Sequence, residues 1–155
     1  MARSPNASAD VPAMEVSDIR RRIRTAIESA RRRTQERRAR TDRAALEYQD
    51  FLRDRAVPLF QTVAAALVAE GYRFKVFTPA DSVRLAAESS GSDFIELSLD
   101  ASLDPPGVLG RTSRGRGSRL VSTERPIKEN TGIADLSEED VLAFLMEEIT
   151  GLVER

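Results

Sequence analysis

The segment from Val16 to Val57 contains neither glycine nor proline, and this constrains the fold more than any other feature. Because glycine and proline are the residues that most often interrupt helices, we predict one long helix over residues 16–56. At about 1.5 Å of rise per residue, this helix would be roughly 60 Å long. Pro58 then either ends or kinks it, or serves as the first residue of a second helix.

One face of the predicted helix is apolar at its two ends. Its residues recur mostly at steps of three and four, as they do along one side of a helix. They are Val16, Ile19, Ile23, Ile27, Ala30, Thr34, Thr41, Ala45, Tyr48 and Leu52. Nucleic-acid binding does not need such an ordered stripe, so the stripe favours a protein partner or self-association, as in a coiled coil. The predicted interface consists of Ile19, Ile23, Ile27, Tyr48 and Leu52.

Charged side chains alternate in sign on the opposite face, at steps of four residues. This ladder consists of Arg24, Glu28, Arg32, Glu36 and Arg40. Each neighbouring pair would contribute about 0.2–0.5 kcal/mol to helix stability, which would support a helix that has no core around it.

The two ends of the chain differ in charge, although the total is only −1. Residues 17–56 hold 13 arginines and 7 acids, whereas residues 126–155 hold 2 basic and 8 acidic residues. This division supports head-to-tail contact between copies or a fold-back of the basic segment onto the acidic one. Two separately solvated faces would also account for it.

After the long helix, the apolar residues follow a helical spacing in some segments and alternate with polar residues in others. This is the pattern of a domain that contains both helices and strands. We predict a helix over residues 58–70 that buries Val68, and a final helix capped by Ser137, in which Met146 helps the packing of the buried face. Alternation of apolar and polar residues predicts five strands between them, at residues 72–78, 82–88, 93–100, 108–112 and 119–123. The predicted fold class is therefore α+β, with both helices packed on one face of an antiparallel β-meander. The predicted domains are a disordered tail at 1–15, a basic helical arm at 16–56 and an α+β domain at 57–155.

The sequence RTSRGRGSR, residues 111–119, is the second arginine-rich feature. Arginines on a glycine-containing loop can neutralise phosphates, so the alternative function is that of a nucleic-acid-binding accessory protein. The predicted phosphate contacts are Arg111, Arg114, Arg116 and Arg119, together with Arg31, Arg33, Arg37 and Arg38 of the arm. A solvated hairpin tip explains the same loop. A genome rich in G and C would also produce 22 arginines against 2 lysines.

Composition argues against several other functions. The chain has no cysteine and no histidine, so it lacks thiolate chemistry, zinc-finger ligands and the usual general base. It also lacks a glycine-rich phosphate loop. We therefore expect no enzymatic activity, no cofactor and no metal.

The same reading gives an expectation for location. The first eighteen residues show no charged segment followed by an apolar run, and the longest apolar run, residues 63–69, is too short to span a bilayer. We expect a cytoplasmic protein. An anionic membrane ranks below protein and nucleic acid as a partner, because the apolar face of the arm has no Trp or Phe before Phe51.

Overall fold

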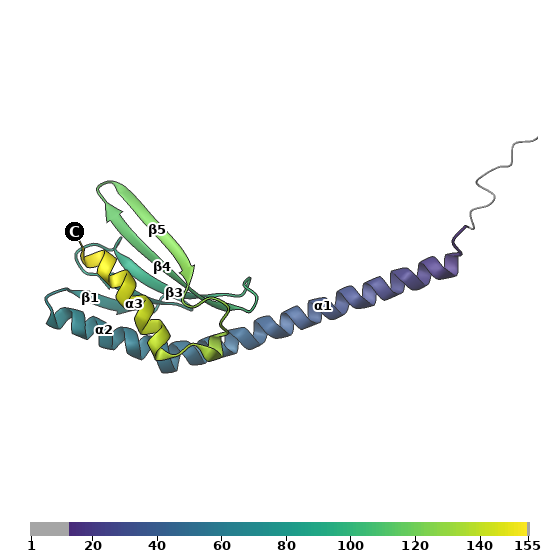
Figure 1. The fold of residues 1–155 in the computed structure, drawn as a ribbon, viewed down its shortest axis with the longest axis horizontal. Helices are drawn as coiled ribbons and strands as arrows, with labels where there is room; N and C mark the ends of the chain where they lie inside the picture. The colour runs from purple at the N-terminus through teal and green to yellow at the C-terminus, as the bar shows by residue number, and fades with distance from the viewer. Residues whose placement is uncertain (1–12, 155) are drawn as a thin grey trace, which may run out of the picture. The chain divides into compact units, whose positions relative to one another are not determined.

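The structure is a computed structural model that describes residues 13–154 (Figure 1). Its elements are α1 (Val16–Phe51), α2 (Val57–Ala69), β1 (Phe74–Phe77), β2 (Val83–Ala87), β3 (Phe94–Asp100), β4 (Gly107–Arg116), β5 (Arg119–Pro126) and α3 (Glu138–Val153). The strands form one antiparallel sheet in the order β1-β2-β3-β4-β5. The predicted α+β layout is confirmed. The predicted tail lies outside the described residues except for positions 13–15.

A π-helical segment, Leu52–Ala56, connects α1 directly to α2. Pro58 is the second residue of α2, which begins one position before the start predicted for a second helix. A proline is tolerated there because the first amides of a helix have no partner within that helix.

The chain divides into two units at Ala39–Arg40, and α1 runs through both. We call residues 16–39 the arm and residues 40–154 the body. The predicted boundary at residue 56 was too late, because the last part of α1 contributes Ala44, Tyr48 and Phe51 to the core of the body. The arm is therefore shorter than the helix that contains it.

One face of the sheet packs against the helices of the body. Gly110 of β4 marks this face, since a Cβ atom there would lie 2.8 Å from both Cε atoms of Phe144 in α3. Directly opposed residues of antiparallel strands share a face, and Gly110 is opposite Leu97, which is opposite Val83. The largest fully buried side chains of this core are Tyr48, Phe51, Phe60, Leu85, Ile95, Leu97, Ile133, Leu136 and Leu145. Figure 1 shows α3 crossing the sheet on this side.

The buried faces of α2 and α3 are narrower than predicted. Val68 is 52% exposed and Met146 is 53% exposed, although Val68 was expected in the core and Met146 was expected to help its packing. The buried face of α3 contains Val141, Phe144, Leu145, Ile149 and Leu152. Met146 directly follows Leu145, so it points about 100° away from a residue that lies near the middle of that face.

Candidate interaction surfaces

The arm carries a row of apolar side chains that the described structure leaves exposed. Ile19, Ile23 and Ile27 are 41%, 52% and 45% exposed, and Val16 precedes them at the start of α1. We call these four residues the isoleucine stripe. Every residue of the arm is exposed except Ser29, which is half-buried. Its three isoleucines are the part of the predicted interface that remains available to a partner.

Tyr48 and Leu52 do not belong to that interface, which corrects the prediction. They are 1% and 8% exposed and belong to the core of the body. The Tyr48 hydroxyl donates hydrogen bonds to the backbone oxygens of Asp81, at 2.7 Å, and Leu97, at 3.3 Å. Burial, with the nearby charges of Asp81 and Glu96, raises the pKa of Tyr48 above its ordinary value, so the hydroxyl stays protonated. At the C-terminal end of α1, the apolar face of the helix thus packs in the core of the body.

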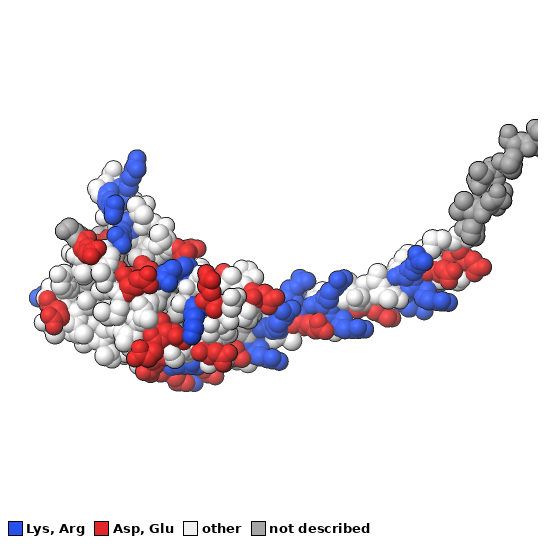
Figure 2. All heavy atoms as spheres, in the orientation of Figure 1, with Lys and Arg blue, Asp and Glu red and all other residues white. Residues whose placement is uncertain are grey.

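The predicted charge ladder does not form in the described arm. Arg24, Glu28, Arg32 and Glu36 make no ion pair with one another there, whereas Arg21 lies 3.9 Å from Asp18. Arg40, the last residue of the ladder, contacts Asp104 of the body at 3.5 Å. The arm holds nine arginines and three acids, a net charge of +6. Figure 2 shows these arginines along α1.

The segment RTSRGRGSR lies in a β-hairpin, which places its arginines on different faces of the sheet. The turn between β4 and β5 consists of Gly117 and Ser118, and Gly117 has the positive φ of +61° that this tight turn uses. Arg114 lies on the helix side of β4, against Gly151 of α3, and Arg116 is opposite Arg119 near the tip. Arg111 is an odd number of residues from both Arg114 and Arg116, so it lies on the other face of the sheet. The four arginines therefore do not form one surface.

Arg111 instead takes part in a charged cluster on the sheet face that bears no helix. Glu96 binds Arg84 at 2.6 Å and Arg111 at 3.8 Å. Both guanidinium groups lie over the ring of Phe94, at 4.1 and 5.2 Å from its centroid. The two arginines thus cover a ring that would otherwise face water. Sequence reasoning missed this cluster, since the cross-strand register is needed to bring Arg84, Glu96 and Arg111 together.

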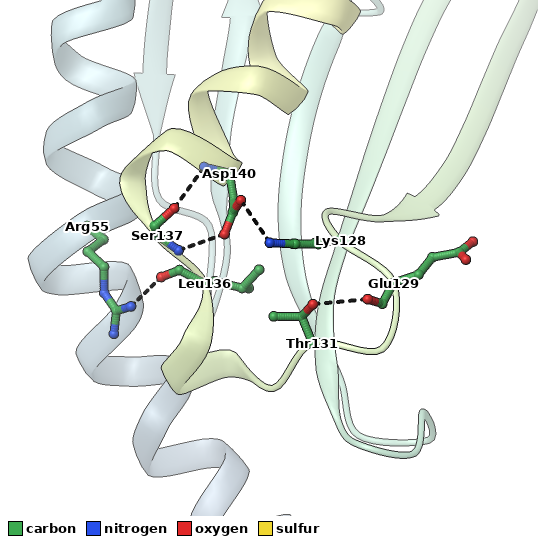
Figure 3. Close-up of polar contacts among 7 residues, drawn as sticks. All are labelled: Arg55, Lys128, Glu129, Thr131, Leu136, Ser137 and Asp140. Carbon is green, nitrogen blue, oxygen red and sulfur yellow. Dashed lines mark hydrogen bonds and ion pairs between the residues drawn. The ribbon is translucent and has the colours of Figure 1, made fainter.

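The start of α3 is fixed by a set of polar contacts (Figure 3). Ser137 is the N-cap, as predicted: its hydroxyl accepts from the Asp140 amide at 3.1 Å, and the Asp140 carboxylate accepts from the Ser137 amide at 3.0 Å. Lys128 lies 3.4 Å from the same carboxylate, and Arg55 donates to the backbone oxygen of Leu136. These contacts join the helix to the preceding loop and to the π-helical segment.

The outward side of α3 is acidic and partly apolar. Glu139, Ala143, Met146 and Glu147 are exposed on it. The helix from Glu138 to Val153 contains five acids and no basic residue. Arg125 of β5 binds Glu147 at 2.9 Å and Glu148 at 3.1 Å, but Glu138 and Glu139 make no ion pair within the described residues. Figure 2 shows acidic atoms over this region of the body.

Replacing Ser137 by alanine is expected to lower the free energy of unfolding by about 0.5–2 kcal/mol, because it removes the acceptor for an otherwise unpaired amide. Urea denaturation at neutral pH measures this loss, with Ser118→Ala in the exposed hairpin turn as the control.

The carboxylate of Asp140 makes the stability of the protein depend on pH. The hydrogen bond that it accepts from the Ser137 amide is the main cause that lowers the pKa of Asp140 below its ordinary value. The contribution of the Asp140 carboxylate to the free energy of unfolding is therefore fully present above the ordinary Asp pKa. It is lost as the pH falls through the lowered pKa. Asp140→Asn should remove that part of the acid dependence, and an unchanged pH profile would contradict this role.

Comparisons with family models, with curated proteins and with solved structures find no match for this chain. No helix in the described part of the chain is long and apolar enough to cross a membrane. Within residues 13–154, no group of acidic side chains comes together in a way that could hold a metal ion.

Proposed function

We propose that this chain is a non-enzymatic protein-interaction module that associates through its arm. The observation that carries the proposal is the isoleucine stripe, whose three isoleucines are between 41% and 52% exposed along successive turns of one helix. Full burial of such a side chain contributes about 1.5–3 kcal/mol. Helices without tertiary contacts are also only marginally stable in water, so a partner that covers the stripe would stabilise the arm as well. This is the helix-in-groove mode of recognition.

The alternative, a nucleic-acid accessory protein, has weaker support. The arm arginines Arg31, Arg33, Arg37 and Arg38 are exposed and could contact phosphates, as could Arg116 and Arg119 at the hairpin tip. Arg111, however, is bound to Glu96 on the other face of the sheet from Arg114. Phosphate contact also gives no role to the isoleucines. The protein-interaction proposal accounts for the isoleucines and leaves the arginines to select the charge of the partner.

Self-association is the form of this proposal that can be tested first. We expect sedimentation velocity of the full chain to show a concentration-dependent complex. Ile23→Ala with Ile27→Ala should weaken it about tenfold or more, because apolar contacts at both positions are truncated. Alanine is the best helix former, so this loss could not be attributed to a poorer helix. The matched control is Arg24→Ala with Glu28→Ala, which changes the other side of the arm and leaves its net charge unchanged.

Two results would count against the proposal. One is a chain that sediments as a monomer at every concentration, and the other is a complex that survives the double isoleucine substitution. A short labelled DNA duplex tests the alternative, with the double isoleucine variant and a variant of the hairpin tip. Binding that falls steeply with salt and is lost in Arg116→Ser with Arg119→Ser, but not in the isoleucine variant, would favour nucleic acid.

A further inference from the structure

We propose that the surface that receives the isoleucine stripe is the outward side of α3 in a second copy of this chain. The inference rests on the proposed function and names the occupant that the proposal leaves open. Each copy carries one arm and one α3, so the contact joins two different surfaces of two identical chains.

The outward side of α3 carries exposed side chains at the spacing of one helix face. Glu139, Ala143, Met146 and Thr150 are all exposed and follow one another at steps of four, three and four residues. They form a single stripe whose centre is the small Ala143 beside the half-exposed Met146. Side chains at this spacing form the ridges and grooves through which two helices pack, and a branched side chain of another helix fits beside a residue as small as alanine. Met146 is also a side chain that adapts readily to an irregular apolar contact.

The two stripes also match in length. The α3 stripe extends from residue 139 to residue 150, and the isoleucine stripe of the arm extends from Val16 to Ile27. Each covers the same number of residues, which at 1.5 Å per residue is about 16 Å, or three helical turns. Two helices can therefore contact each other along the whole of both stripes.

Charge selects α3 over a second arm as the partner. Two arms placed side by side would each carry a net charge of +6, with arginines flanking the isoleucines on both. The helix α3, in contrast, carries five acids and no base. Glu138 and Glu139 make no ion pair within the described chain, so both carboxylates are available to arm arginines. Exposed ion pairs contribute little individually, so the charges determine the choice of partner, while the isoleucines and Met146 supply the affinity.

Complementation between two defective full-length chains tests the inference. One chain carries Ile23→Ala and Ile27→Ala, and the other carries Ala143→Lys and Met146→Lys. We expect each chain alone to lose self-association about tenfold or more, and an equimolar mixture to form a complex with one copy of each. In that mixed complex, the intact arm of the second chain meets the intact α3 of the first. Sedimentation of the mixture, with one chain fluorescently labelled, detects the complex.

Two controls keep the outcome interpretable. Val68→Lys places one lysine at an apolar site on α2 that is 52% exposed, against 53% for Met146, and should leave association unchanged. Melting temperatures show that each variant is folded, which is expected because all substituted side chains are exposed.

Three outcomes are distinct. Recovery of a complex in the mixture supports the inference. Normal self-association of the α3 variant, with the arm variant monomeric, overturns the inference but leaves the proposed function standing, since the arm then meets another surface. A wild-type chain that stays monomeric overturns both the inference and self-association through the arm, and leaves only a different protein as the partner of the arm.

Discussion

Replacing Phe51 by alanine is expected to lower the free energy of unfolding of the body by about 3–5 kcal/mol. Phe51 is the last residue of α1 and is fully buried. Its ring stacks on that of Tyr48, at 6.3 Å between centroids, and the guanidinium of Arg55 lies 5.5 Å from it. Truncation would leave a cavity between the helix and the sheet that these neighbours can fill only in part. Urea denaturation followed by circular dichroism measures the loss.

Ile23→Ala, in the same helix, is the matched comparison. Measured at a concentration where the chain is monomeric, it should change the stability of the body by no more than about 0.5 kcal/mol, because the side chain is exposed in the arm. The pair of substitutions thus tests where the arm ends. Similar losses in both variants would contradict a boundary at Ala39–Arg40.

Gly110→Ala is expected to cost about 1–3 kcal/mol, although it adds only a methyl group. The added Cβ would overlap the ring of Phe144, whose Cε atoms would be 2.8 Å away. Both β4 and α3 are held by neighbours, so the ring cannot move aside without loss of packing elsewhere. The absence of a side chain at Gly110 therefore lets α3 approach the sheet.

Gly91→Ala is the control for this prediction. A Cβ at Gly91 would meet no atom within 4 Å, and its backbone does not have a positive φ. We expect its free energy of unfolding to equal that of the wild type or to be slightly higher, since alanine restricts the unfolded chain. If the two glycine variants were equally stable, the packing of Phe144 over β4 would be wrong.

Much of the fold follows from local patterns. Ser137 was predicted to cap the final helix, and the capping box that it forms with Asp140 at the start of α3 confirms this. Alternation predicted the five strands, although β4 and β5 extend beyond the predicted ends at Thr112 and Thr123. Their extra residues are serine, arginine, glycine, glutamate and proline, none of which is enriched in strands.

Only part of the interface on α1 could be predicted from the sequence, because the spacing of apolar residues does not show what they pack against. Ile23 and Tyr48 lie on one helical stripe and have the same periodicity, yet Tyr48 is buried against the sheet and Ile23 is exposed. Periodicity shows which side of a helix is apolar, but not what covers it. Arg111 illustrates a related limit. In the sequence it belongs to a run of arginines, whereas the register of β3 and β4 pairs it with Glu96.

Hydrogen exchange along α1, at two concentrations of the full chain, tests the central claim most directly. Exchange of amides in residues 16–39 should slow as the concentration is raised from about 1 to 100 µM, because association by mass action protects the arm. Amides of residues 44–51, which lie in the core of the body, should be protected equally at both concentrations. Arm amides that exchange at the same rate at both concentrations would contradict association through the isoleucine stripe.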